Sequence, residues 1–254
     1  MGIPRNYQTQ AIVIKQSKLG EIDKILTFYT PELGKLRAVA KGICRPGSKL
    51  GGNVEPLTCS LMMLARGRNL DIVTQSQTLD GFLVLKSDLG LMAYGLYILE
   101  LIDSFTMENN VNRPLFDLLL DALHWLSQAN NNNEIVLRYF ELHLLQHLGY
   151  RPELYRCVKC NSPLKPVVNF FSSSQGGMLC PHCSQKEYLP CPLSVDALKI
   201  LRLWQNCDYV TARRVKIESK LSLELEQLLR EYIGYLLQRR PKSITWLEEL
   251  KKMP

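Results

Sequence analysis

Two short cysteine pairs, Cys157-Val-Lys-Cys160 and Cys180-Pro-His-Cys183, stand in this chain with nineteen residues between them. Each tight Cys-x-x-Cys turn can supply two of the four tetrahedral ligands that zinc requires, so the spacing predicts a four-thiolate site. The intervening segment 169–178 combines a strand pattern with a Gly-rich turn, as in a zinc ribbon. We therefore predict one structural Zn²⁺ ion, with no coordination position left for substrate. The alternatives are unliganded thiols or a redox-active dithiol.

The composition predicts a globular protein of the cytoplasm. The chain has 254 residues, of which 46% are hydrophobic, and this is enough for two modest domains or one large one. It contains no apolar run long enough to cross a membrane and begins without an apolar signal region. Scattered cysteines outside the two pairs fit a reducing compartment. These are Cys44, Cys59, Cys191 and Cys207.

Positive charge is concentrated in the N-terminal third. The whole chain has a formal net charge of +7. Residues 1–80 carry eleven basic and six acidic side chains, a balance of +5, and the remaining residues carry twenty and eighteen, a balance of +2. Such an excess indicates an acidic partner, most often nucleic acid.

The same N-terminal region has the pattern of a small β-barrel. Five short runs rich in β-branched and apolar residues alternate with Gly- and Pro-containing turns, which predicts a closed barrel of the size of an oligonucleotide-binding (OB) fold. The predicted strands are residues 9–16, 24–30, 35–41, 56–64 and 70–78.

The apolar period then changes from two to nearly four, which predicts helices. Ser87 or Asp88 can cap the first helix, Ser194 can cap a later one, and Gly149 can end the helix at 134–148. We therefore predict an α+β protein. Its domains are an OB-fold nucleic-acid-binding domain at 1–80 and a helical domain at 81–254, with an inserted zinc ribbon, the four-cysteine module, at about 155–190.

Basic side chains gather in and around the third predicted strand, where Glu55 is the single acid between residues 35 and 68. Such a cluster binds phosphates with little sequence preference and a steep dependence on salt. The alternative is an ordinary solvated surface. The candidate DNA contacts are Lys35, Arg37, Lys41, Arg45, Lys49, Arg66 and Arg68.

Other candidates give weaker signals. Tyr7, Phe28 and Tyr29 are the nearby aromatic residues that could stack on bases. His143 and His147 stand four apart on one predicted helix but lack the Glu of a zinc-protease motif, so we interpret them as ordinary helix residues. A second basic cluster has an undetermined role, either as an extension of a DNA path or as a solvated turn. It comprises Arg213, Arg214, Lys216 and Lys220.

No catalytic constellation is present in the sequence. It has no Gly-x-Ser-x-Gly elbow and no phosphate-binding P-loop, and Leu179 occupies the place of the proline that a zinc deaminase needs before its cysteine pair. We therefore predict that the protein is not an enzyme. Two alternatives remain open: a zinc-ribbon subunit of a transcription or RNA-processing complex, and a metal-dependent nuclease or hydrolase.

At several places the sequence resembles the bacterial DNA repair protein RecO family. The matching segments follow in the same order along most of the chain. They are Leu19-Gly-Glu-Ile-Asp23, Leu26-Thr-Phe-Tyr-Thr30, Gly34-Lys35, Ala40-Lys-Gly42, Leu148-Gly-Tyr-Arg-Pro152 and the two cysteine pairs.

This resemblance implies a recombination mediator made of an OB barrel, a helical body and a zinc module. Such a protein binds single- and double-stranded DNA, anneals complementary strands and works with RecR. It engages single-strand-binding protein and, indirectly, RecA, and is expected at the nucleoid. On this chain the resemblance implies DNA contacts at the basic barrel residues and zinc ligation by the four cysteines. The loop beginning Ile43-Cys-Arg-Pro-Gly47 is less basic than in many relatives.

Overall fold

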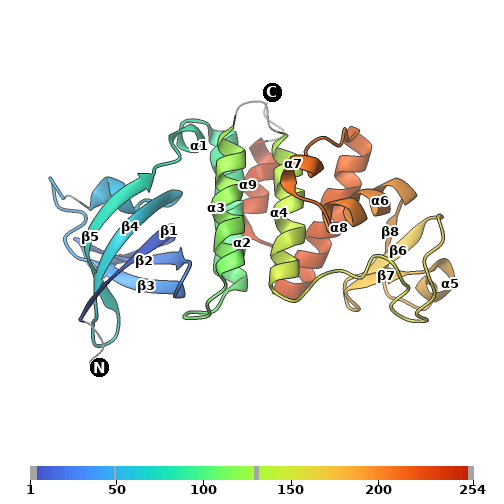
Figure 1. Ribbon diagram of the computed structural model, residues 1–254, viewed down its shortest axis with the longest axis horizontal. Helices are drawn as coiled ribbons and strands as arrows, with labels where there is room; N and C mark the ends of the chain where they lie inside the picture. Colours follow the sequence, from blue (N-terminus) through green and yellow to red (C-terminus); the bar gives the residue numbers. More distant parts are fainter. Residues whose placement is uncertain (1–4, 49, 129–131, 251–254) are drawn as a thin grey trace. The chain divides into compact units, whose positions relative to one another are not determined.

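The computed structural model describes residues 5–48, 50–128 and 132–250 (Figure 1). The chain divides into two compact units, the first formed by residues 1–129 together with 241–254 and the second by residues 130–240. The elements of the first unit are β1 (Asn6–Leu19), β2 (Asp23–Thr30), β3 (Gly34–Ala40), the 3-10 helix η1 (Gly51–Val54), β4 (Thr58–Ala65), β5 (Asp71–Asp80), α1 (Leu83–Ser87), α2 (Leu89–Phe105), α3 (Arg113–Ser127) and α9 (Lys242–Leu250).

The five strands close into a barrel, as the sequence predicts, and their order around it is β1-β2-β3-β5-β4. Neighbouring strands are antiparallel except β3 and β5, whose short parallel contact pairs Ala38 with Asp71 and Val39 with Ile72. This contact joins the two ends of the sheet and closes the barrel.

Alternation along the strands places one set of side chains inside the barrel. Leu26 and Phe28 of β2 lie opposite Ala38 and Leu36 of β3, and the first three of these are fully buried. Tyr29 points to the opposite side of β2, yet it is also fully buried. Helix α2 contacts β1 and helix α3 contacts β2, so helices cover part of the outer barrel surface as well.

Helix α2 organises the remainder of the first unit. Its N-terminus is capped by Asp88, whose Oδ1 accepts a hydrogen bond from the Leu91 amide at 2.8 Å. Further along, the carboxylate of Glu100 accepts hydrogen bonds from the amides of Lys242 and Ser243 at 2.9 and 2.8 Å. These bonds satisfy two amides at the start of α9 and fix that C-terminal helix to α2.

The second unit combines helices with a small three-stranded sheet in the order β7-β6-β8. The strand and Gly-rich turn predicted between the cysteine pairs are confirmed, whereas β8 was not predicted because it has three residues and includes Pro192. The elements of this unit are α4 (Asn133–His147), β6 (Asn169–Ser172), β7 (Gly177–Leu179), α5 (Pro181–Ser184), β8 (Cys191–Leu193), α6 (Val195–Trp204), α7 (Tyr209–Ala212) and α8 (Ser219–Leu237).

A buried ion pair lies in the core of the second unit. Nη1 of Arg138 is 3.1 Å from Oε2 of Glu141, and the two side chains are 2% and 0% exposed. The same Nη1 donates to the main-chain oxygen of Glu226 on α8 at 3.3 Å. Burial of these charges requires that they remain paired, so the contact between α4 and α8 is specific as well as apolar.

The predicted boundary near residue 80 coincides with the change from strands to helices, between β5 and α1. The boundaries between the two compact units lie at other places, one before α4 and one after α8. None of the helices in the described ranges is long and apolar enough to span a bilayer.

Candidate metal centre and nucleic-acid interface

The two cysteine pairs come together as the sequence predicts. The Sγ atoms of Cys157, Cys160, Cys180 and Cys183 all lie within 4.8 Å of one another, and those of Cys160 and Cys180 are 3.9 Å apart. A tetrahedral ion with metal–sulfur bonds of about 2.3 Å places its sulfur atoms about 3.8 Å apart. The cluster can therefore hold one metal ion, and its donor set fits a thiolate-binding metal.

Local turns aim the four sulfur atoms at one point. In the first pair, Asn161 adopts the left-handed conformation (φ 59°) and its amide donates to the Cys157 oxygen at 2.8 Å. The Cys157 amide in turn donates to the Ser162 oxygen at 2.9 Å. In the second pair, the Ser184 amide donates to the Cys180 oxygen at 3.0 Å at the start of the short helix α5. Each pair is thus held by its own backbone hydrogen bonds.

The surroundings favour the thiolate at two of these positions. The Cys160 sulfur lies 3.4 Å from the Ser162 hydroxyl, and hydrogen bonding to Ser162 lowers the pKa of Cys160 to about 6. Burial acts to raise the pKa of Cys157, but backbone amides, led by that of Cys180, outweigh it and the pKa is lowered. A thiolate is the form that binds a metal, so these hydrogen bonds favour the ligand form in the first pair, whereas burial raises the pKa of Cys183 to about 12.

The module around the cysteines has a very small apolar core. Leu179 is fully buried there and Phe170 packs against it. Gly177 is needed where β7 approaches the first pair, because a Cβ atom at this position would lie 2.6 Å from Cγ1 of Val158 and 2.9 Å from the main-chain oxygen of Glu153. So small a core gives a module of this size little stability without cross-links or a metal.

The histidines stay outside the cluster, as predicted. His182 is exposed on α5. His143 and His147 are partly buried on α4, and Nε2 of His143 is 2.9 Å from the main-chain oxygen of Trp204. Burial lowers the pKa of both residues of α4. Within the described residues, the four cysteines form the single group of three or more potential ligands.

The two basic residues of β3 contact acidic residues of the helical segment. Nζ of Lys35 donates to the main-chain oxygen of Asp103 at 2.7 Å and lies 3.4 Å from its Oδ1, with 11% of the side chain exposed. Nη1 of Arg37 lies 3.6 Å from Oε1 of Glu108, with 42% exposed. The ammonium group of Lys35 is therefore already bonded to Asp103 of the same chain, whereas part of the Arg37 side chain remains accessible to solvent.

Lys41 and Arg45 are both exposed in the loop after β3. The loop is fixed to the β1–β2 turn, because Oδ1 of Asp23 accepts a hydrogen bond from the Gly42 amide at 2.6 Å. Gly42 itself has a φ of +64°, a conformation that a side chain would strain. The basic side chains therefore project from a supported loop. Lys49, a further predicted contact, lies outside the described residues.

Arg66 and Arg68 are exposed at the tip of the β4–β5 hairpin. Asp71 holds this tip, accepting a hydrogen bond from the Gly67 amide at 3.0 Å and one from the Tyr7 hydroxyl at 2.5 Å. The Arg66 guanidinium lies 5.1 Å from the centre of the Tyr7 ring, a cation–π contact. Because β5 starts beside Ala38, the tip lies next to the strand that leads to Lys41.

Two further lysines, which the sequence pattern did not single out, lie near the loop after β3, but on the strand face of Ala40 and not on that of Arg37 and Lys41. Lys18 lies opposite Lys24 in the β1–β2 pair, and Lys24 lies opposite Ala40, directly before Lys41. The strand register that joins them was the missing information. Of the aromatic candidates, Phe28 and Tyr29 are fully buried and cannot stack on bases.

The second basic cluster is exposed in the second unit, between α7 and the first turn of α8. Its role, either as an extension of a DNA path or as a solvated turn, stays undetermined. Its members are Arg213, Arg214, Lys216 and Lys220.

These features define a class: an α+β protein with a five-stranded, OB-like barrel, helices and a four-cysteine module. Comparison with known proteins is consistent with this. The model for "Recombination protein O N terminal" matches residues 3–82, and that for "Recombination protein O C terminal" matches residues 86–244.

Relatives named DNA repair protein RecO match nearly the whole chain. One from Dehalococcoides mccartyi is 39% identical over 249 residues, which is 98% of both chains. One from a Roseiflexus species is 41% identical over 98% of this chain and 87% of its own, and one from Desulforamulus reducens is 36% identical over 97% and 95%. The chain therefore belongs to the RecO family of DNA repair proteins.

Proposed function

We propose that this protein is a recombination mediator that binds single- and double-stranded DNA and anneals complementary strands. The observation that carries the proposal is the group of exposed basic side chains around the β3–β5 contact of the barrel. Membership of a DNA repair family supports it. No covalent bond is made or broken in annealing, so the function needs no catalytic residue, and the protein is proposed not to be an enzyme.

The proposed DNA contacts follow from exposure. Lys41, Arg45, Arg66 and Arg68 present charge to solvent, and Arg37 contributes at the edge of the group. The set predicted from the sequence also includes Lys49, which lies outside the described residues, and Lys35, whose Nζ is bonded to Asp103 and which we do not count among the proposed contacts. Phosphates that meet this surface release counterions, which gives affinity with little sequence preference.

The mechanism is electrostatic. Two complementary strands repel each other through their phosphates, and a basic surface on a rigid barrel lowers that repulsion while the bases find their partners. The backbone hydrogen bonds that hold the loop after β3 and the hairpin tip keep the positive charges in place. Annealing should therefore be fastest at low ionic strength and should fade as salt screens the surface.

The metal is proposed to be one zinc ion with a structural role. Four thiolates saturate a tetrahedral ion, so no position remains for a reacting water molecule. Cys157, Cys160, Cys180 and Cys183 would hold it, and the ion would supply the cohesion that the small apolar core of the module lacks. Structural zinc contributes roughly 10–16 kcal/mol in small zinc-finger peptides.

The proposed partners are those of a mediator. Besides DNA, they are RecR, single-strand-binding protein and, through their joint action, RecA, which the protein would help to load onto coated single strands. The cellular site would be the cytoplasmic nucleoid, where this DNA is found. Loading is tested by RecA filament assembly on coated single strands, with and without RecR.

The primary test is annealing of two complementary oligonucleotides, followed by fluorescence over a salt series. We expect acceleration at low salt that is weakened in the double variant Arg37→Ala with Lys41→Ala. The logarithmic salt slope for single-strand binding should fall by about 0.7 for each phosphate that is no longer neutralised. Lys199→Ala is the matched control, because Lys199 is an exposed lysine of α6 in the second unit.

A folded, metal-loaded sample that does not accelerate annealing at low salt would refute the annealing mechanism. A double variant equal to the unmodified protein would instead move the contacts away from β3 and its loop. The two results are distinguishable because binding and annealing are measured separately.

A further inference from the structure

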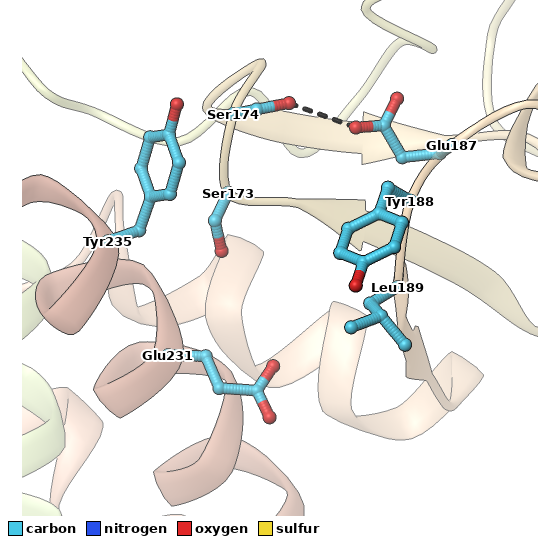
Figure 2. A pocket seen from close by; sticks show the side chains of 7 residues that line it. All are labelled: Ser173, Ser174, Glu187, Tyr188, Leu189, Glu231 and Tyr235. Atoms are coloured by element: carbon cyan, nitrogen blue, oxygen red, sulfur yellow. Dashed lines mark hydrogen bonds between the residues drawn. The ribbon is translucent and has the colours of Figure 1, made fainter.

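A pocket in the second unit is lined by acidic side chains, in contrast to the basic surface of the barrel. Its volume is about 430 Å³, and it lies between the four-cysteine module and helix α8. Figure 2 shows Glu231 and Tyr235 extending from α8, and Tyr188 and Leu189 carried by the facing chain segment. The lining includes two acidic side chains and no basic one. The full lining is Ser173, Ser174, Glu187, Tyr188, Leu189, Glu231 and Tyr235.

The acidic group of Glu187 is held in a fixed position. Its Oε1 accepts hydrogen bonds from the hydroxyls of Ser172 and Ser174 at 3.0 and 2.9 Å, and the second of these is drawn in Figure 2. In the described part of the chain, Oε2 of Glu187 has no hydrogen-bond partner. One oxygen thus positions the carboxylate, and the other is available to a ligand.

The second acidic side chain of the pocket, Glu231, extends from helix α8. Oε1 of Glu231 accepts a hydrogen bond from Nε2 of Gln227, one turn earlier on α8, at 2.9 Å. Behind these residues, the rings of Phe171 and Tyr232 meet edge to face at 5.1 Å, which joins β6 to α8. The two walls of the pocket are therefore fixed to each other by packing.

The apolar part of the pocket is unusually exposed. Tyr188 and Leu189 are 89% and 80% exposed, and Tyr235 is 52% exposed. Leu189 also has a φ of +47°, a left-handed conformation that is uncommon and strained for a branched side chain. Strained backbone that presents apolar side chains to water is found at binding surfaces.

From this combination we propose that the pocket binds a basic segment of a partner protein by accepting an arginine or lysine side chain. The carboxylates of Glu187 and Glu231 would pair with the cation, the Tyr188 and Tyr235 rings would contact its face or its aliphatic stem, and Leu189 would receive a neighbouring apolar residue. Charge complementarity decides the occupant, because nucleic acid and acidic peptides would be repelled by the same two carboxylates.

The test uses a five-residue probe peptide, acetyl-Gly-Leu-Arg-Leu-Gly-amide, titrated into the ¹⁵N-labelled full chain with zinc. Amide chemical shifts should change at 187–189 and 231–235 and should saturate. A peptide with citrulline in place of arginine has the same shape without the charge, and we expect it to bind about tenfold more weakly because its hydrogen bonds are no longer charge-assisted.

Variants then assign the contacts. Glu231→Gln, on the exposed face of α8, and Glu187→Gln should each weaken binding about tenfold. Tyr188→Ala removes an almost fully exposed ring, so its effect reports ligand contact without a folding defect. Asp196→Asn is the control, since Asp196 is an exposed acid of the same unit outside the pocket.

Equal binding of the arginine and citrulline peptides, or shifts located elsewhere, would overturn the proposal. Concentration-dependent self-association by sedimentation that disappears in Glu187→Gln would also overturn it, because the occupant would then be a second copy of this chain. Strand annealing should be unchanged in all four variants, so failure here is separate from failure of the proposed function.

Discussion

Nζ of Lys35, on strand β3 of the barrel, donates to the main-chain oxygen of Asp103, near the end of helix α2, at 2.7 Å. Oδ2 of the same aspartate pairs with Nζ of Lys15 on β1 at 3.1 Å. One acidic residue therefore joins two strands of the barrel to the helix that packs on it. Part of the basic excess of the N-terminal region is used inside the first unit rather than presented to a partner.

Lys35→Met and Lys41→Met should separate these two uses of lysine. Lys35→Met removes a largely buried donor, and we expect the free energy of unfolding to fall by about 1–3 kcal/mol. Its DNA salt slope should stay unchanged. Lys41→Met should leave the stability unchanged and lower the slope for single strands by about 0.7. Denaturant unfolding and salt-dependent anisotropy measure both quantities. A reduced slope in Lys35→Met would instead confirm the sequence-based prediction that Lys35 contacts DNA.

Cys157→Ser should abolish metal binding and unfold the four-cysteine module, because its apolar core is too small to persist alone. Calorimetry should show an altered transition for the second unit, and metal analysis should show no bound ion. A strong chelator should produce the same change in the unmodified protein. Cys44→Ser, at an exposed cysteine of the first unit, is the control and should keep the metal. A metal-free Cys157→Ser chain with unaltered melting would exclude the structural role.

Glu141→Gln should destabilise the second unit strongly. It leaves the Arg138 charge buried without its carboxylate, and breaking a buried pair in this way costs about 3–5 kcal/mol. Asp196→Asn removes a pair of the same i,i+3 spacing, Asp196 with Lys199, but at the surface, where the expected cost is about 0–1 kcal/mol. Denaturation midpoints of the two variants measure the difference. Similar midpoints would mean that water reaches the buried pair.

Stability should decrease as the pH falls below about 7, and His143 should contribute to this decrease together with His147. Burial lowers the pKa of His143 in the folded state, so below the ordinary histidine pKa of about 6.5 the unfolded chain binds a proton that the folded chain does not. Protonation therefore favours unfolding, with a slope of up to about 1.4 kcal/mol per pH unit for one such group.

His143→Gln should flatten this dependence below about pH 7. Glutamine can still donate to the Trp204 oxygen, so the bond at that place is retained while the titrating group is removed. Unfolding free energies measured at several pH values give the comparison, and His124→Gln is a control at a partly exposed histidine of the first unit. Parallel pH curves for the unmodified protein and His143→Gln would rule out this histidine as a cause.

The sequence by itself determined the local elements and the ligand set. Period-two runs specified the five strands, because alternation is what a sheet with one buried face requires. Gly34, which closes the β2–β3 turn at a φ of +68°, was readable as a turn residue for the same local reason. The cysteine spacing was sufficient to predict the four-cysteine cluster because both members of each pair lie in one short turn.

Tertiary structure alone decided which charges remain available and which segments meet. Lys35 and Lys41 share one side of the strand pattern, yet Asp103, sixty-eight residues further along the chain, is bonded to the first, and no local rule predicts that pairing. Likewise, the return of α9 to Glu100 and the placement of Glu187 and Glu231 around one pocket depend on packing between distant segments. The spacing of apolar residues shows which face of each segment is buried. Which other segment packs against that face depends on the tertiary structure.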